Sequence, residues 1–330
     1  MEGKVLGAVF ALAGMIAVAV FGGIWGENAA PREKSPRIFW EVIPGIGATR
    51  APEGPDPLEA DILACGKLAE TMEAEHVFVY DCVAKRMLCC TSDADARVYP
   101  ASITKLFTAW GALQILSEDA VITVEKDALA LVDKGSSLAL LAPGHRLRVE
   151  QLVEAMLLPS GNDAAWVLAA ATGRELAGEK LPAAEAAGLF LEKLEEMARS
   201  IGAENTHFST PDGYHRDTHV STPVDLAILG AAAAENPLIR RYSTCFADTV
   251  VFESGQRITW YNTNRLSNPE DSFYEPSMVA GKTGYTGEAG CCLLAVAEKN
   301  GRRILVGIFG AKDRTRRYAY ANGLLDALGI

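Results

Sequence analysis

The sequence predicts an α+β fold in which helices flank an antiparallel sheet. Strand-like segments lie towards both ends of the chain, and helix-like segments fill the region between them. Neighbouring strands are joined by short turns, which favours antiparallel pairing. Of the 330 residues, 49% are apolar and 22% are charged, so a single domain can bury a sizeable core. We expect that domain to span residues 56–330.

The individual elements are predicted from apolar periodicity and from capping and turn residues. Asp56 can cap a first helix that reaches about Thr71. Further helices are expected over residues 102–116, 149–158, 183–200 and 313–328, and one that begins at residue 163. Strands are expected over residues 76–81, 86–90, 249–253, 257–261, 291–297 and 304–309. Asn300-Gly301, between the last two strands, is typical of a hairpin turn.

The amino-terminal segment, residues 1–26, predicts export. The 21 residues from Val5 to Trp25 carry no charge, and a helix of that length can cross a bilayer. An uncleaved signal anchor and a cleaved signal peptide are both possible. The length of the apolar segment favours the anchor, and so does the poor fit of the candidate cleavage site at residues 28–30. Residues 27–55 are rich in proline and glycine and are expected to form a spacer before the folded domain.

Composition excludes some classes of function. The chain has 31 Lys and Arg against 42 Asp and Glu, a net charge of −11, and no basic stripe, so we expect no nucleic-acid partner. The seven cysteines show no Cys-x-x-Cys spacing and the five histidines form no cluster, so no metal site is expected. The adjacent pairs Cys89-Cys90 and Cys291-Cys292 are interpreted as core residues.

The first candidate site is Ser102-Ile103-Thr104-Lys105, at the start of a predicted helix. Residues three apart share a helix face, so the amine of Lys105 can reach the hydroxyl of Ser102. A neutral amine could accept the serine proton, and burial or a second cation lowers the pKa of a lysine. Taken alone, the pair is better explained by an N-cap serine followed by a surface lysine.

Two further motifs change that judgement. Ser160-Gly161-Asn162 separates two predicted helices, and Lys282-Thr283-Gly284 precedes a predicted strand. Each could be a glycine-containing loop. Ser-x-x-Lys, Ser-x-Asn and Lys-Thr-Gly nevertheless each occur once, in this order, and a closely related trio marks β-lactamases and penicillin-binding proteins.

The chain resembles the serine-type D-alanyl-D-alanine carboxypeptidases, which are low-molecular-mass penicillin-binding proteins. The resemblance covers residues 57–330 and extends to four segments, residues 99–105, 157–165, 205–213 and 281–290. It implies a β-lactamase/transpeptidase-like fold with a helical subdomain. Many relatives carry a second, β-rich domain and a carboxy-terminal anchor. Here we expect no carboxy-terminal β-domain, and the amino-terminal span would anchor the enzyme at the extracytoplasmic face of the bacterial membrane, or the domain would be secreted after cleavage.

The resemblance also implies the chemistry. Ser102 would attack the penultimate carbonyl of a peptidoglycan stem pentapeptide that ends in D-Ala-D-Ala, with Lys105 as general base. Ser160 would pass a proton to the leaving amine, and water would then hydrolyse the acyl-enzyme. No cofactor or metal is implied, and β-lactam antibiotics would act as acylating inhibitors.

The remaining roles concern substrate binding. Asn162 would hold a substrate amide and help to orient Lys105. Lys282, assisted by Thr283, would pair with the terminal carboxylate and, as a second cation, keep Lys105 neutral. The backbone N–H groups of Ser102 and Tyr285 would hold the oxyanion.

Three alternatives remain open. A class A-like β-lactamase would need a Glu-x-x-Leu-Asn segment, and residues 163–281 contain none. A penicillin-acylated sensor domain usually accompanies several membrane spans and a cytosolic effector. A transpeptidase differs only in whether an amine or water takes the acyl group.

Overall fold

The computed structural model describes residues 57–330. The predicted signal segment (residues 1–26), the spacer (residues 27–55) and Asp56 lie outside the described residues. Within the described part, no helix combines the length and apolar character needed to cross a membrane.

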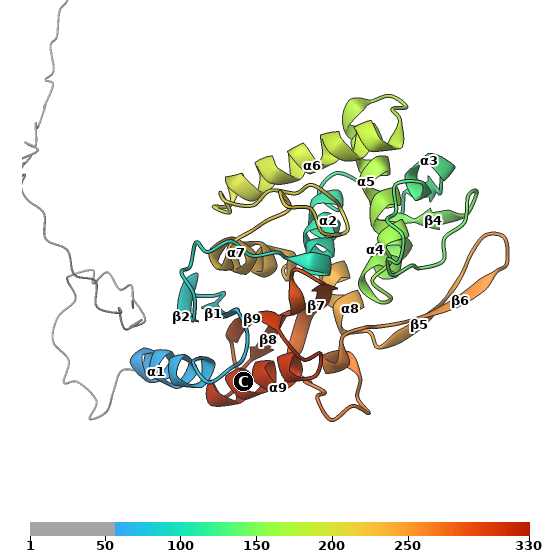
Figure 1. The fold of residues 1–330 in the computed structure, drawn as a ribbon. Helices are drawn as coiled ribbons and strands as arrows, with labels where there is room; N and C mark the ends of the chain where they lie inside the picture. Colours follow the sequence, from blue (N-terminus) through green and yellow to red (C-terminus); the bar gives the residue numbers. More distant parts are fainter. Residues whose placement is uncertain (1–56) are drawn as a thin grey trace, which may run out of the picture. The chain divides into compact units, whose positions relative to one another are not determined.

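A five-stranded antiparallel sheet forms the centre of this domain, with strand order β2-β1-β9-β8-β7 (Figure 1). Its strands are β1 (His76–Asp81), β2 (Arg86–Cys90), β7 (Met278–Thr286), β8 (Gly290–Lys299) and β9 (Arg302–Ala311). β1 lies directly beside β9, with His76 opposite Phe309 and Asp81 opposite Ile304. The two ends of the domain therefore share one sheet, which confirms the predicted architecture and leaves β7 at an edge.

The sheet is covered on both faces. Along β9 successive side chains alternate: Ile304, Val306 and Ile308 belong to one buried cluster, and Leu305 and Phe309 to another. The first cluster packs against α1 (Pro57–Ala69) and α9 (Arg316–Ala327). The second packs against the helices that lie between β2 and β7 in sequence (Figure 1).

The helical part surrounds α2 (Thr104–Ala112), in which every residue is buried. The other helices are α3 (Lys126–Leu129), α4 (Val149–Leu157), α5 (Asn162–Ala177), α6 (Ala183–Ser200), α7 (Pro223–Ala233) and α8 (Pro237–Thr244). Two small antiparallel ribbons accompany them, β3 (Val121–Thr123) with β4 (Arg146–Arg148), and β5 (Ala247–Val251) with β6 (Arg257–Tyr261). Short 3-10 turns are η1 (Ala101–Ile103) and η2 (Arg265–Ser267).

Most predicted elements are present, and two of the differences concern the site. The helix expected over residues 102–116 begins as η1 and is α-helical only from Thr104 to Ala112. The Lys282 motif lies within strand β7 rather than in a loop, because its backbone pairs with Leu293 and Leu294 of β8. Helices α7 and α8 were not expected from the sequence; each begins with a proline after a Thr or Asn cap.

Candidate active site

Ser102 lies in the short turn η1, which leads into the buried helix α2. The preceding residue, Ala101, has a φ of 47°, in the left-handed region that residues other than glycine rarely adopt. Such conformations persist where the surrounding structure enforces them, and they cluster at functional sites. The turn places Ser102 beside strand β7, because a Cβ added to Gly284 would lie 3.0 Å from the backbone nitrogen of Ser102.

Lys105 lies one helical turn after Ser102, as predicted. Its Nζ donates to the Oγ of Ser102 at 2.8 Å and to the backbone carbonyl of Asp212 at 2.8 Å. The side chain is fully buried, and burial lowers the pKa of Lys105 to about 8, although the charges of Asp212 and Asp163 oppose the shift. A substantial fraction of this amine is therefore neutral near pH 8 and can accept the proton of Ser102.

The two carboxylates whose charges act on Lys105, those of Asp212 and Asp163, already accept hydrogen bonds from N–H donors. Asp212 accepts from the Nε1 of Trp166 at 3.2 Å and from the backbone N–H of Tyr214 at 2.9 Å. The oxygens of Asp163 accept three backbone N–H groups, those of Ala139, Leu141 and Ala164. Both side chains therefore serve to hold the backbone. Sequence reasoning identified residues 211–213 as part of a family signature but did not foresee that the Asp212 carbonyl binds Lys105.

Lys282 is the second buried lysine, in edge strand β7. Its Nζ donates to the carbonyl of Thr283 at 3.0 Å and to the Oγ1 of Thr263 at 3.4 Å. The hydroxyls of Thr263 and Thr283 are 2.9 Å apart. Burial lowers the pKa of Lys282 well below its usual range, and repulsion from Lys105 and Arg317 lowers it further. A carboxylate bound beside these hydroxyls would favour the charged form of Lys282 and could be held by it.

Arg317 of α9 adds a third buried cation that the sequence analysis missed. Its Nη1 donates to the carbonyls of Gly284 and Cys292, at 3.0 Å each, and its Nη2 donates to the Tyr318 hydroxyl at 3.1 Å. Within residues 57–330 it forms no ion pair with a carboxylate, and its Nε is buried without a partner. The guanidinium therefore holds strand β7 from the side on which α9 lies, and it adds positive charge to the site.

Ser160 and Asn162 lie at the junction of α4 and α5. Ser160 has a φ of 63° and is 6% exposed, and Asn162 is 5% exposed. A Cβ on the intervening Gly161 would lie 2.7 Å from both the Ala139 Cβ and the Ala155 carbonyl oxygen, so the turn requires glycine. In the described part of the chain no hydrogen bond joins either side chain to Lys105. The orienting role expected of Asn162 stays a prediction.

A backbone hydrogen bond ties this junction to the region of Lys282. The N–H of Thr263 donates to the carbonyl of Leu158 at 3.0 Å, and the Thr263 hydroxyl contacts both Lys282 and Thr283. The structure thus connects the second motif to the third through a residue that sequence reasoning did not single out. Asn262 and Asn264, on either side of Thr263, bind backbone groups and hold this segment in place.

Tyr285 lies near the end of β7 that leads into the turn to β8. Its side chain is 54% exposed, and the guanidinium of Arg314 lies 4.8 Å from the centre of its ring. Its backbone is paired with Cys291 of β8. The preceding residue, Gly284, lies against Ala101 and Ser102 of turn η1. The backbone of Tyr285 is therefore close to Ser102.

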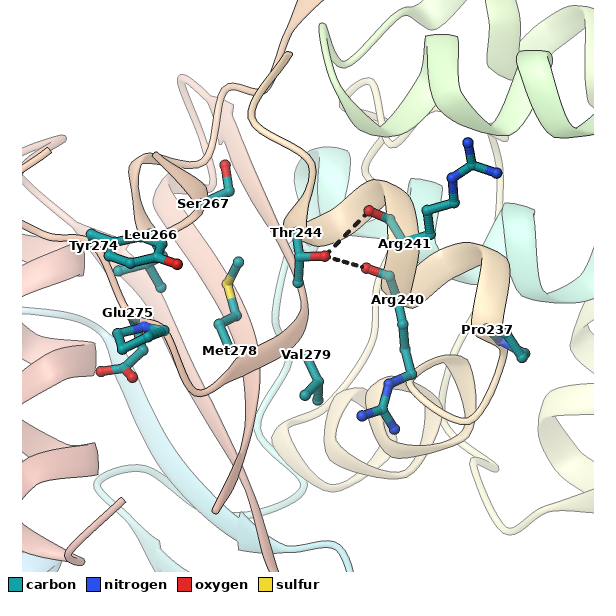
Figure 2. Close-up of a pocket in the computed structure, with 11 residues that line it drawn as sticks. Pro237, Arg240, Arg241, Thr244, Leu266, Ser267, Tyr274, Glu275, Met278 and Val279 are labelled. Carbon is teal, nitrogen blue, oxygen red and sulfur yellow. Dashed lines mark hydrogen bonds between the residues drawn. The ribbon is translucent and has the colours of Figure 1, made fainter. Parts of the chain in front are cut away.

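A cavity of about 410 Å³ lies between α8 and the start of β7 (Figure 2). Its lining includes Arg240, Arg241, Tyr274 and Glu275 but none of the motif residues. Arg240 is paired with Glu298. This cavity is therefore not part of the site assigned to Ser102. Among residues 57–330 there is also no group of three His, Cys, Asp or Glu side chains arranged to hold a metal ion.

Comparison with known proteins gives one consistent family. The model of the D-alanyl-D-alanine carboxypeptidase family matches residues 64–313. D-alanyl-D-alanine carboxypeptidase DacF of Bacillus subtilis (strain 168) is 29% identical over 71% of this chain and 57% of its own length. The D-alanyl-D-alanine carboxypeptidase of Streptomyces sp. (strain K15) is 31% identical over 72% of this chain and 80% of its own length. DacA of Escherichia coli (strain K12) is 30% identical over 77% of this chain and 60% of its own length.

Solved structures agree with these relatives. The crystal structure of the Streptomyces K15 DD-transpeptidase superposes with a TM-score of 0.70 at 29% identity, covering 78% of this chain and 98% of that one. The chain spans less than two thirds of the length of the Bacillus and Escherichia relatives.

Proposed function

The chain belongs to the D-alanyl-D-alanine carboxypeptidase family, and we propose that it is a serine peptidase that removes the terminal D-Ala from peptidoglycan stem peptides. One observation carries the proposal. The Nζ of Lys105 is fully buried, 2.8 Å from the Oγ of Ser102, and its pKa is lowered to about 8. A serine hydroxyl beside a largely desolvated amine is an activated nucleophile.

Acylation then proceeds as follows. Lys105 accepts the proton of Ser102 as Oγ bonds to the carbonyl carbon of the penultimate D-Ala. The charge that develops on the carbonyl oxygen is stabilised by the backbone N–H groups of Ser102 and Tyr285. The proton held by Lys105 is relayed through the hydroxyl of Ser160 to the amine of the terminal D-Ala, which leaves Lys105 neutral again; the C–N bond breaks, and free D-Ala leaves. The product on the enzyme is an ester on Ser102.

The cationic side of the site binds the substrate's terminal carboxylate. Lys282 and Thr283 make that contact, and the hydroxyl of Thr263 lies within the same group. Arg317 holds the Gly284 carbonyl and adds positive charge behind the strand. Asn162, buried at the start of α5, binds a substrate amide. A free carboxy terminus is therefore the feature that the enzyme requires of its peptide.

Water completes the reaction by hydrolysing the ester. A transpeptidase would instead pass the acyl group to an amine, and the structural relative from Streptomyces K15 carries that name. A class A-like β-lactamase is less well supported, because residues 163–281 lack the Glu-x-x-Leu-Asn segment that it would need. The apolar segment from Val5 to Trp25 would place the domain outside the bacterial cytoplasmic membrane.

The experiment is a direct assay of the purified protein. Incubation with a pentapeptide that ends in D-Ala-D-Ala should release free D-Ala, and Ser102→Ala should release none. Added glycine distinguishes water from an amine as the acyl acceptor. A transpeptidase would transfer the acyl group to glycine and form a glycine-terminated peptide. A folded wild-type protein that neither releases D-Ala nor forms that product would refute the proposal.

A further inference from the structure

His219 is a buried histidine that lies far from Ser102 in sequence but contacts the turn that carries it. Its side chain is 1% exposed. Its Nε2 lies 2.8 Å from the Oγ1 of Thr104, the first residue of α2. Its Nδ1 accepts backbone N–H groups from Ser209 at 3.0 Å and Thr210 at 3.3 Å. None of the three sequence motifs includes His219.

These contacts define which nitrogen carries the proton. Because Nδ1 accepts two N–H groups, the proton of the neutral ring is on Nε2. The hydroxyl of Thr104 donates its single hydrogen to the carbonyl of Ala101 at 2.8 Å, so it must accept from His219. Burial lowers the pKa of His219 to about 3, so the ring remains neutral at physiological pH. The hydrogen bonds run in one direction, from His219 to Thr104 to Ala101.

The Ala101 carbonyl at the end of this chain is tightly confined. It also accepts the backbone N–H of Thr104. A Cβ placed on Gly213 would lie 1.8 Å from the Ala101 oxygen, and Gly213 itself has a φ of 77°. Ala101 itself has a φ of 47°, in the left-handed region. Several contacts therefore hold a backbone conformation that is unfavourable by itself.

Holding that carbonyl has a consequence for the next residue. The peptide group is planar and trans, so the C=O of Ala101 and the N–H of Ser102 point in opposite directions from one rigid unit. We propose that His219 is a positioning residue that acts through Thr104 to hold the Ala101–Ser102 peptide group and so to aim the Ser102 N–H at the substrate's oxyanion. This inference rests on the proposed function, which assigns that N–H to the oxyanion.

The test separates acylation from binding and from stability. Penicillin acylation of Ser102 is resolved into the dissociation constant of the initial complex and the rate constant of acylation, and the melting temperature is measured for each variant. Thr104→Val removes the hydroxyl at constant shape, and Thr104→Ser retains it. Thr172→Val is the matched control, because Thr172 is an equally buried threonine whose hydroxyl donates to a helix carbonyl, that of Leu168.

We expect Thr104→Val to lower the acylation rate constant about tenfold or more, since misdirecting an oxyanion donor weakens a contact made mainly in the transition state. The dissociation constant should change by no more than about twofold, because the ground-state carbonyl depends less on that donor. Thr104→Ser should restore the rate. Thr172→Val should acylate like the wild type even where its melting temperature falls.

Two histidine variants address the ring itself. Asn can replace the Nδ1 acceptor, and Gln can replace the Nε2–H donor. His219→Asn should therefore lose more of the acylation rate than His219→Gln. An acylation rate constant for Thr104→Val equal to that of Thr172→Val would overturn the proposal. A wild-type protein with no penicillin adduct would instead overturn the proposed function, and the positioning role with it.

A measurement on the unaltered protein covers the case in which these variants fail to fold. Nitrogen-15 NMR of the imidazole should show a neutral ring with the proton on Nε2 across the range in which the enzyme is active. A proton on Nδ1, or a charged ring, would contradict the direction of the hydrogen bonds and so the proposal.

Discussion

At the scale of single residues, the proposed reactivity depends on two lysines that are both buried away from water. Lys105 contacts Ser102 and the Asp212 carbonyl, while Lys282 contacts threonine oxygens. An ammonium group that exchanges water for neutral oxygen acceptors loses solvation, so its charged form is disfavoured. Repulsion from Lys105 adds to this effect at Lys282. In the proposed chemistry Lys105 accepts a proton, and a bound carboxylate would restore the charged form of Lys282.

Replacing Lys105 should remove chemistry and leave the fold intact. We expect Lys105→Ala to acylate at least about 100-fold more slowly with penicillin, since the general base is lost. In the wild type the acylation rate should rise with pH with a midpoint near 8, because the neutral amine becomes more abundant as pH rises through that pKa. Stopped-flow acylation from pH 6 to 10, with thermal unfolding as a control, checks both. Near-normal acylation by a folded variant would assign the base to another group, such as Ser160.

Substitutions of Lys282 separate its charge from its hydrogen bonds. A substrate carboxylate beside Lys282 favours its charged form, so in the complex Lys282→Gln removes a positive charge near Lys105. The pKa of Lys105 should then rise, and the acidic limb of the rate profile measured with the peptide should move to higher pH. Lys282→Arg retains the charge, so its limb should stay near the wild-type position while peptide binding weakens. An unshifted limb in the Gln variant would show that Lys282 only binds substrate, and that burial lowers the pKa of Lys105 without its help.

At the scale of elements, the contact between edge strand β7 and turn η1 brings the motifs together. Gly284 has no side chain, and a Cβ there would lie 3.0 Å from both the Ala101 Cβ and the Ser102 nitrogen. Neither atom belongs to a flexible side chain that could move away. Glycine therefore lets the strand lie this close to the turn without displacing it.

Gly284→Ala should accordingly push β7 away from Ser102. We expect acylation by penicillin to slow by about 10-fold, less than the roughly 100-fold that misplacement by a full ångström can cause, with a loss of only a few degrees in melting temperature. Gly287→Ala is the matched control, since a Cβ at that position meets nothing within 4 Å. Equal acylation rates for the two variants would show that the close approach of β7 does not matter for catalysis.

At the scale of the whole domain, the site is formed where segments from three parts of the chain meet. Ser102 and Lys105 belong to η1 and α2, Ser160 to the junction of α4 and α5, and Lys282 to β7. The carboxylates that act most strongly on Lys105, Asp212 and Asp163, hold loops in place through their N–H contacts. Neither of these two carboxylates is therefore assigned to activate a water molecule against an ester on Ser102, and residues 163–281 lack the Glu-x-x-Leu-Asn segment of class A β-lactamases.

The β-lactam adduct should consequently be long-lived. We expect mass spectrometry of penicillin-treated protein to find a covalent adduct on the peptide that contains Ser102, with little loss over hours after the free drug is removed. Ser102→Ala should carry none. Rapid hydrolysis of penicillin with no accumulated adduct would identify the enzyme as a β-lactamase and contradict the proposed function.

Much of this molecule could be predicted from sequence because the relevant signals are local. The hairpin turn at Asn300-Gly301 marks β8 and β9, and the helix predicted over residues 183–200 is the observed α6. The spacing of Ser102 and Lys105 correctly placed amine and hydroxyl together, since three residues make nearly one helical turn. The order of the three motifs along the chain was also enough to identify the family.

What only the tertiary structure decided are contacts between residues far apart in sequence. Nothing in the local pattern shows that the Asp212 carbonyl binds Lys105, that Arg317 supports β7, or that His219 reaches the nucleophile turn. A pattern of apolar and polar residues specifies which face of an element is buried, but not which distant partner covers it. Motif chemistry could therefore be predicted from sequence, whereas the pKa of Lys105 and the direction of the Ser102 N–H depend on how the chain packs around them.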